Sequence, residues 1–415
     1  MVGLVVGGRM RESAERSLDE LSRLAEAAGA TPILRVMQER RSPNPATFLG
    51  AGKVESLRVA CDETGANLVV VDNELSPAQL RNLEEGLDRR VVDRTQIILD
   101  IFARRARTRE GKLQVELAQL RYLLPRLVGA ATALSRLGGG IGTRGPGETK
   151  LETDRRRIRR RIGALADAIE LVRRRRAQLR DRRQRASVPT VALVGYTNAG
   201  KSTLFNRLTG QQAQVSDALF VTLDPLVRQV TLPDQRQILL SDTVGFIDRL
   251  PHALVAAFRA TLEEVAEADL LLHVIDGSSE DRELHADAVR RVLVDVEAAD
   301  VPMLTVFNKC DLVGDGARHR FDRHDGETLA VSAHTGDGVE ALRRAILSRL
   351  SLETCRVAVD LDATSAADQD RVRGLYRHAR VLQHEHIGGR VTITADVPRR
   401  LIARLRLVES AYEVR

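Results

Sequence analysis

The residues with the clearest chemistry lie between Val191 and Thr203, where the chain reads VALVGYTNAGKST. This stretch has the pattern G-x-x-x-x-G-K-[ST], after an apolar run that predicts a buried strand and before a helical pattern. Glycines let backbone N–H groups approach phosphate oxygens closely, and a helix N-terminus adds its positive dipole. The stretch therefore predicts a phosphate-binding loop. A merely glycine-bent turn would be a serious alternative if the motif stood alone.

The predicted loop assigns candidate contacts to a run of consecutive residues. We expect Lys201 to reach the β- and γ-phosphates and to act in catalysis, and Ser202 to offer its hydroxyl to Mg²⁺. The candidate nucleotide-binding residues of the loop are Gly195, Tyr196, Thr197, Asn198, Ala199, Gly200, Lys201, Ser202 and Thr203.

Two motifs downstream of the loop carry groups that can act on the γ-phosphate. Thr222 lies in a polar-flanked loop, about where a threonine could close over Mg²⁺ and the γ-phosphate. Asp242 follows an apolar strand and is expected to project toward the metal as a further nucleotide-site residue, while Gly245 can donate its N–H to the γ-phosphate. We therefore expect Thr222 and Gly245 to act in catalysis, and Ser202 and Thr222 to bind the metal.

Two later motifs predict which base is bound. Asn308-Lys309-Cys310-Asp311 and Ser332-Ala333-His334 each follow an apolar run that predicts a strand. A carboxylate there can accept from N1–H and N2–H of guanine, whereas adenine has neither donor in that arrangement. Motifs in this order, each at the end of a predicted strand, favour GTP or GDP as the ligand. The candidate base contacts are Asn308, Lys309, Asp311, Ser332, Ala333 and His334.

Length and composition limit the class of protein. A chain of 415 residues exceeds what one core normally serves, so two to four domains are expected. No apolar run approaches the ~20 residues needed to span a bilayer, and the first residues lack the pattern of a signal peptide. The 3 cysteines are scattered without metal-ligand spacing. These features predict a cytoplasmic protein without a membrane span.

Four segments with different patterns divide the chain, and the predicted fold class is α/β. Residues 1–105 alternate strand and helix patterns and predict an N-terminal α/β domain. Residues 106–187 carry apolar residues at spacings of four and three, which predict an antiparallel coiled-coil hairpin with a glycine-rich tip. Residues 188–350 predict a P-loop GTPase domain. Residues 351–415, with a helical pattern over 368–383, predict a small C-terminal α/β domain.

Positive charge is concentrated in the second half of the predicted hairpin. The net charge is +7, but residues 155–185 contain 14 arginines and 3 acidic residues, which leaves the remainder of the chain negative. Guanidinium groups pair with phosphates and stack on bases, so this segment favours RNA as a partner. A solvated charged face or a different acidic partner are the alternatives. The candidate RNA-binding residues are Arg144, at the tip, and Arg155, Arg156, Arg159 and Arg160.

Two features of the first domain allow more than one interpretation. The segment NPATFLGAGK, Asn44–Lys53, could form another anion-binding turn, although an ordinary loop with a glycine-assisted helix start is favoured. An ATP-dependent RNA-unwinding activity of this domain would depend on that segment alone. Asp72, Asn73 and Glu74 follow a predicted strand and could be functional, although acidic residues at the end of a strand are usually just solvated.

The motifs NPATFLGAGK, GGGIGTRGPGETKLETDRR, GYTNAGKST, TLDP, DTVGF and NKCD together closely resemble the HflX family of ribosome-associated GTPases, over roughly Val2–Leu350. The resemblance implies binding to the large ribosomal subunit and its rRNA, with the hairpin tip directed toward the peptidyl-transferase region. It also implies a role in splitting or rescuing stalled ribosomes, particularly under stress. The alternative is a GTP-gated assembly or checkpoint factor of the large subunit without splitting activity.

The residue that follows Gly245 predicts slow hydrolysis. Small signalling GTPases place there a glutamine that orients the attacking water, whereas this chain has Phe246, which cannot hydrogen-bond to water through its side chain. We expect turnover to be slow in the isolated protein and stimulated by a partner. Asn198 resembles the asparagine that holds a potassium ion in some related GTPases, so K⁺ is a candidate cofactor beside Mg²⁺.

Overall fold

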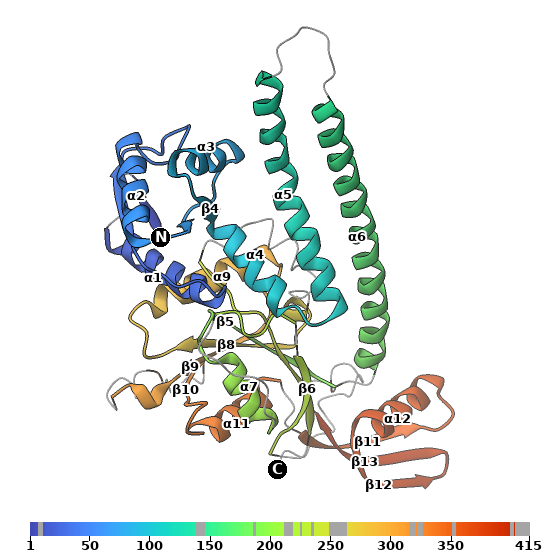
Figure 1. Ribbon diagram of the computed structural model, residues 1–415. Coiled ribbons are helices and arrows are strands. Elements are labelled where there is room, and N and C mark those ends of the chain that lie inside the picture. Colours follow the sequence, from blue (N-terminus) through green and yellow to red (C-terminus); the bar gives the residue numbers. More distant parts are fainter. Residues whose placement is uncertain are drawn as a thin grey trace.

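The computed structural model describes residues 1–6, 11–137, 146–185, 188–210, 219–224, 226–233, 236–248, 264–314, 321, 327–350, 354–398 and 402 (Figure 1). Within the two longest helices, side chains are described over 109–127 and 152–174. Across these described ranges, no helix combines the length and the apolar character needed to cross a lipid bilayer.

The N-terminal part folds around a four-stranded parallel sheet with the order β2-β1-β3-β4. Helices connect its strands, because parallel neighbours need a crossover rather than a tight turn. The strands are β1 Val2–Val6, β2 Val36–Arg40, β3 Leu68–Val71 and β4 Arg90–Asp93. The helices are α1 Arg11–Ala27, α2 Ala51–Thr64, α3 Pro77–Leu87 and α4 Arg94–Arg105.

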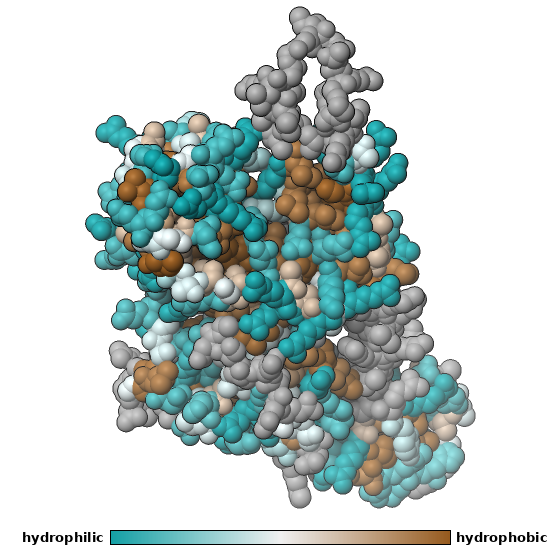
Figure 2. Space-filling model, viewed as in Figure 1, coloured by the Kyte–Doolittle hydropathy of each residue, from teal (hydrophilic) through white to brown (hydrophobic). Residues whose placement is uncertain are grey.

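Two long helices form a hairpin that projects from the rest of the molecule. Helices α5, Arg109–Leu137, and α6, Pro146–Arg185, lie side by side and antiparallel (Figure 1). Tyr122 on α5 donates a hydrogen bond to Asp93 over 2.8 Å, so the first half of α5 is bound to the N-terminal domain. Figure 2 shows a mostly hydrophilic face, with a hydrophobic patch where the hairpin rises above that domain.

The central part is a six-stranded sheet with the order β10-β9-β8-β5-β7-β6, in which only β6 runs antiparallel to its neighbour. Chain order reverses between β5 and β8, and ligands of such sheets bind beyond the carboxyl ends of the strands at this point. The strands are β5 Thr190–Gly195, β6 Leu226–Thr231, β7 Gln237–Asp242, β8 Leu270–Asp276, β9 Met303–Asn308 and β10 Thr328–Ala330. The main helices are α7 Lys201–Thr209, α9 Arg282–Asp295 and α11 Val339–Arg349, and a 3-10 turn covers Cys310–Leu312.

Strand β5 is buried on both faces, and its two faces belong to different cores. Val191 and Leu193 pack with α7 and α11. Ala192 and Val194 belong to a cluster that also contains buried residues of α1, α4, α5 and α9. One face of the strand that leads into the predicted phosphate loop is therefore packed in a core that it shares with the N-terminal domain and with α5.

The C-terminal part is a three-stranded antiparallel sheet with one helix, and one element differs from the prediction. The elements are β11 Thr354–Asp362, α12 Ala366–His378, β12 Arg380–Ile387 and β13 Arg390–Pro398, with sheet order β11-β13-β12. The helix predicted over 368–383 ends at His378. Residues 380–383, which were predicted as helical, instead form the beginning of the edge strand β12. Gly388 and Gly389, with φ of 57° and 85°, form the two-residue turn that joins β12 to β13. Paired positive φ angles are typical of tight hairpin turns, so this Gly-Gly pair was the missed signal.

The α/β fold class predicted from the sequence is confirmed, with an N-terminal α/β part, the sheet of a P-loop domain and an added C-terminal antiparallel sheet. The exact domain boundaries stay predictions.

Candidate nucleotide-binding site

The loop between β5 and α7 curves tightly because two of its residues have no side chain. Gly200 adopts a φ of 86°, and a Cβ atom there would overlap Nδ2 of Asn308. That nitrogen donates to the carbonyl of Ala199 over 2.9 Å. At Gly195 a Cβ atom would overlap the carbonyl oxygen of Val274 on β8. Any other residue at either position would push the loop away from its neighbouring strand.

Lys201 lies at the first position of α7 with its ammonium group inside the curve of the loop. Its Nζ donates to the carbonyls of Gly195, at 3.0 Å, and Tyr196, at 2.8 Å. Burial lowers the pKa of Lys201 to about 8, and the nearby Asp242 carboxylate opposes this shift. A buried cation that faces backbone groups at a helix N-terminus can receive a phosphate group.

Three oxygen-bearing side chains from separate elements converge next to Lys201. Ser202 Oγ lies 2.9 Å from Thr222 Oγ1, and these hydroxyls donate to Oδ2 of Asp242 over 2.8 and 3.0 Å. Oδ1 of Asp242 is buried and has no hydrogen-bond partner among the described residues. Burial raises the pKa of Asp242, while Lys201 and the two hydroxyls lower it. Hydroxyl and carboxylate oxygens are the ligands that Mg²⁺ prefers.

The segment after β7 is joined to the loop through its backbone. Thr197 N donates to the carbonyl of Phe246 over 2.7 Å, and Phe246 N donates to the carbonyl of Gly195 over 3.1 Å. A Cβ atom at Gly245 would lie 2.8 Å from Cγ2 of Thr197 and 3.1 Å from Nζ of Lys201. The Phe246 ring is buried in the core, so it offers no group to a water molecule at this site.

The predicted base contacts are brought together by Asn308, which lies at the end of β9. Its Oδ1 accepts from Ala333 N over 2.9 Å, so the second base motif is held against the loop. Ser332 donates from its hydroxyl to Asp311 over 2.6 Å, and the Asp311 side chain remains exposed. Lys309 forms an ion pair of 2.7 Å with Asp276 at the end of β8. This places the carboxylate of Asp311 at the edge of the sheet where a base can reach it.

Three predicted residues, two in the phosphate loop and one in the second base motif, do not direct their side chains into this site. Asn198 has a φ of 61° and an exposed side chain at the turn of the loop. His334 is exposed and uses its carbonyl to accept from Arg207. Tyr196 contributes its carbonyl to Lys201, but its ring stacks on His285 with centroids 4.0 Å apart.

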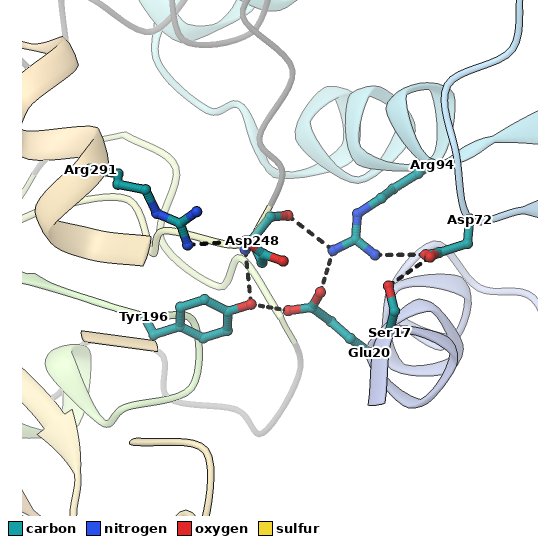
Figure 3. A network of polar contacts seen from close by, with 7 residues as sticks. All are labelled: Ser17, Glu20, Asp72, Arg94, Tyr196, Asp248 and Arg291. Carbon is teal, nitrogen blue, oxygen red and sulfur yellow. Dashed lines mark hydrogen bonds and ion pairs between the residues drawn. The ribbon is translucent and has the colours of Figure 1, made fainter. Parts of the chain in front are cut away.

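The Tyr196 hydroxyl belongs to a polar network that the sequence did not indicate (Figure 3). It donates to Glu20 on α1 and accepts from Asp248 N over 2.8 Å. Arg94, at the start of α4, also donates to Glu20 and to the carbonyl of Asp248, the latter over 3.2 Å. The network therefore connects the N-terminal domain both to the phosphate loop and to the segment that follows Gly245.

Asp72 completes this network on the side of the N-terminal domain. Its Oδ1 accepts from Arg94 over 3.0 Å, and its Oδ2 accepts from the Ser17 hydroxyl over 2.6 Å (Figure 3). Of the two interpretations of Asp72, the usual one, a solvated strand-end residue, is wrong, because the carboxylate is buried. Although burial opposes it, the two carboxylates raise the pKa of Arg94 above its usual value. No local pattern around residue 72 reveals that α1 and α4 close over it.

A cavity of about 340 Å³ lies beside this network. Its walls come from α1, from residues 196–199 of the phosphate loop, from the end of β8 and from α9. His273 of β8 lines the cavity, and its Nε2 is buried without a hydrogen-bond partner among the described residues. Burial lowers the pKa of His273 to about 4, so its ring is neutral near pH 7.

The other predicted sites are only partly described. Arg144 lies outside the described residues. On α6, Arg156, Arg159 and Arg160 are exposed, and Arg155 is half-buried. In the N-terminal domain, the segment Asn44–Lys53 forms a loop that leads into α2, whose N-terminus has no side-chain cap. This geometry is compatible with both interpretations of the segment.

Family models of GTP-binding proteins match three consecutive parts of the chain. Residues 15–103 match a family model described as "GTP-binding GTPase N-terminal", residues 105–183 one described as "GTP-binding GTPase Middle Region", and residues 190–309 one described as "50S ribosome-binding GTPase". The chain is 47% identical over 394 residues to GTPase HflX of Lacrimispora saccharolytica, covering 95% of this chain and 92% of that protein. It is 46% identical over 386 residues to GTPase HflX of Escherichia coli, covering 92% of this chain and 89% of that protein.

The comparison with solved structures also found similar chains. One is a GTP-binding protein from the hyperthermophilic archaeon Sulfolobus solfataricus in complex with GDP, with a TM-score of 0.43 and 24% sequence identity, covering 85% of this chain and 99% of that chain. The curated relatives match this chain through the N-terminal domain, the hairpin and the P-loop domain alike. The chain therefore belongs to the HflX family and is a GTPase.

Proposed function

We propose that this GTPase binds the large ribosomal subunit through its hairpin and uses GTP to split or rescue stalled ribosomes. The observation that carries the proposal is the row of exposed arginines on α6, Arg156, Arg159 and Arg160, on a hairpin that projects from the molecule (Figure 1). Exposed guanidinium groups in excess over acids fit the phosphates and unstacked bases of rRNA. The description "50S ribosome-binding GTPase" of the model matched by residues 190–309 supports the same partner.

The geometry of the loop supports separate roles for its polar groups. Lys201 neutralises the β- and γ-phosphates, because its buried ammonium group already lies against the loop backbone. Gly245 donates its N–H to the γ-phosphate at a place where a side chain would contact Lys201. Asn308 fixes the loop against the base motif, and Asp311 accepts from guanine.

The residues present fit Mg²⁺, the ion that P-loop GTPases generally use with their nucleotide. Two hydroxyls, of Ser202 and Thr222, meet the carboxylate of Asp242, whose second oxygen is buried and unpartnered within the described ranges. Ser202 and Thr222 would hold the ion, and Asp242 would orient them. When bound, the ion would supply positive charge that offsets the negative charge of the phosphates.

Slow turnover in the isolated protein follows from the buried ring of Phe246. With no side chain from this position to orient the attacking water, hydrolysis depends on groups that are arranged when a partner binds. Asn198, exposed at the turn of the loop, is the residue we assign to a K⁺ ion. Ribosome-stimulated turnover should then be faster in potassium than in sodium, and equal rates would contradict that assignment.

Sedimentation of intact ribosomes tests the main proposal. Ribosomes incubated with the protein and GTP should separate into free subunits, whereas Lys201→Ala should leave them intact. If the protein bound immature large subunits and left mature ribosomes unseparated, an assembly or checkpoint function would replace the splitting function.

The arginine contribution needs a matched control for loss of charge. Replacing Arg156, Arg159 and Arg160 by alanine should weaken ribosome binding and reduce its salt dependence, because fewer phosphates are neutralised. Arg144→Ala tests the hairpin tip in the same assay. A control protein carries alanine at three arginines elsewhere whose side chains are 43% to 68% exposed, namely Arg58, Arg290 and Arg373. Equal binding by both triple variants would contradict an arginine-directed hairpin.

A further inference from the structure

Asp224, two residues after Thr222, contacts the beginning of the first hairpin helix. Its Oδ2 accepts from the backbone nitrogens of Arg107 and Thr108, both over 2.8 Å, and its Oδ1 accepts from the Thr108 hydroxyl. These donors come directly before α5, which begins at Arg109. The N-terminus of a helix carries partial positive charge, so a carboxylate bound to the residues just before α5 is a favourable cap.

Gly111, in the first turn of α5, leaves the space that this carboxylate occupies. A Cβ atom at residue 111 would overlap Oδ1 of Asp224. Thr108 is held in the same place, because its Oγ1 also accepts from Gly111 N over 3.0 Å. Glycine is disfavoured in helices relative to alanine. Its presence here is explained by the approach of Asp224.

Apolar contacts attach the same segment to the N-terminal domain and to α5. Phe220 meets Phe102 of α4 edge to face, with ring centroids 4.7 Å apart. Leu219, Phe220 and Leu223 are buried in the cluster that contains Val115 of α5. The residues on both sides of Thr222 are therefore fixed to α4 and α5, while Thr222 itself reaches Ser202 and Asp242.

We propose that Asp224 is a positioning residue that couples the nucleotide state at Thr222 to the orientation of the hairpin. A displacement of Thr222 that follows loss of the γ-phosphate must either carry Asp224 with it or break its hydrogen bonds to residues 107 and 108. In both cases the hydrogen bonds that hold the beginning of α5 in place change. A helix of 29 residues is on the order of 43 Å long, so a small rotation at its beginning moves its far end by a larger distance. This coupling belongs to the chain itself and does not depend on a ribosomal partner.

Hydrogen exchange in the full-length protein, without ribosomes, tests the coupling. Backbone amides of the first two turns of α5 are compared with GDP and with a non-hydrolysable GTP analogue bound. The wild type should show different exchange rates in the two states. In Asp224→Asn the difference should disappear, and exchange should be roughly five-fold faster in both states, the factor that corresponds to losing a cap worth ~1 kcal/mol.

Two further variants keep the result interpretable. Gly111→Ala retains the carboxylate but displaces it, and it should abolish the nucleotide-dependent difference even if Asp224→Asn unfolds the first turn. Asp300→Asn, an exposed acidic residue of the same domain, should behave as the wild type. A purely structural cap would raise exchange in Asp224→Asn and preserve the difference between nucleotide states, and this result would overturn the proposal. Identical exchange in the two states of the wild type would overturn it as well.

Discussion

Replacing Arg94 by methionine should loosen the N-terminal domain from the nucleotide site. The Arg94 side chain is 4% exposed, and it binds the carboxylates of Asp72 and Glu20, whose side chains are 6% and 18% exposed. Methionine fills a similar volume but leaves both carboxylates without their cation. Removing one partner of a buried ion pair costs ~3–5 kcal/mol. Because Glu20 keeps its bond from the Tyr196 hydroxyl, we expect a loss near the lower end, about 3 kcal/mol.

Two measurements on the full-length variant give the size and the location of the effect. Denaturant unfolding gives the change in free energy. Hydrogen exchange reports on Asp248, whose N–H donates to Tyr196 and whose carbonyl accepts from Arg94. Exchange of this amide should become faster in Arg94→Met, because the segment that follows Gly245 loses its hydrogen bond from Arg94.

Arg58→Met is the matched control, since Arg58 pairs with Glu55 on the exposed surface of α2 in the same domain. Surface pairs of this kind contribute little to stability, so we expect no measurable change. If Arg94→Met unfolded at the same denaturant concentration as Arg58→Met, and exchange at Asp248 were unchanged, the buried network would have no role in holding the two domains together.

Three further predictions concern single residues of the site. His273→Leu should remove a pH dependence: the pKa of this histidine is about 4 when folded against an ordinary 6.5, so about 3 kcal/mol of stability should be lost in the wild type as the pH falls from 6.5 to 4. Urea unfolding of the wild type and His273→Leu between pH 6.5 and 4 measures this loss. An equal fall in the free energy of unfolding of both proteins would contradict the prediction. Gly200→Ala should weaken GDP binding at least tenfold, because a strained left-handed residue costs ~1–2 kcal/mol and its Cβ also displaces Asn308. Gly210→Ala is the control: residue 210 has a φ of 68° but no neighbour within 4 Å, so this variant introduces the backbone strain without the overlap. Ser202→Ala should weaken GTP binding in Mg²⁺ but leave binding in EDTA unchanged, and an equal loss in both titrations would exclude a metal-directed hydroxyl.

The elements that carry the candidate nucleotide-binding residues were predictable because each of their motifs is local. The strand, the turn and the start of the helix all lie within residues 190–203 and follow from local sequence. The carboxyl ends of neighbouring parallel strands then bring Asp242 and Asn308 to the same edge. For the same reason the hairpin helices, with their regular apolar spacing, were predictable as elements. The helix over 368–383 was mispredicted at its end, because pairing with β13 outweighs local helical spacing in an edge strand.

The contacts between domains could not be predicted in this way. Tyr196 lies within a phosphate-loop motif, yet its hydroxyl binds Glu20, 176 residues away in the chain. Asp224 caps a helix whose first residues lie more than 100 positions earlier. Sequence by itself determined the chemistry of the nucleotide site and the identity of its elements, since these depend on local spacing. Only the tertiary structure decided which domain holds that site in place, because burial of Asp72, Arg94 and Tyr196 arises when surfaces distant in the chain pack together.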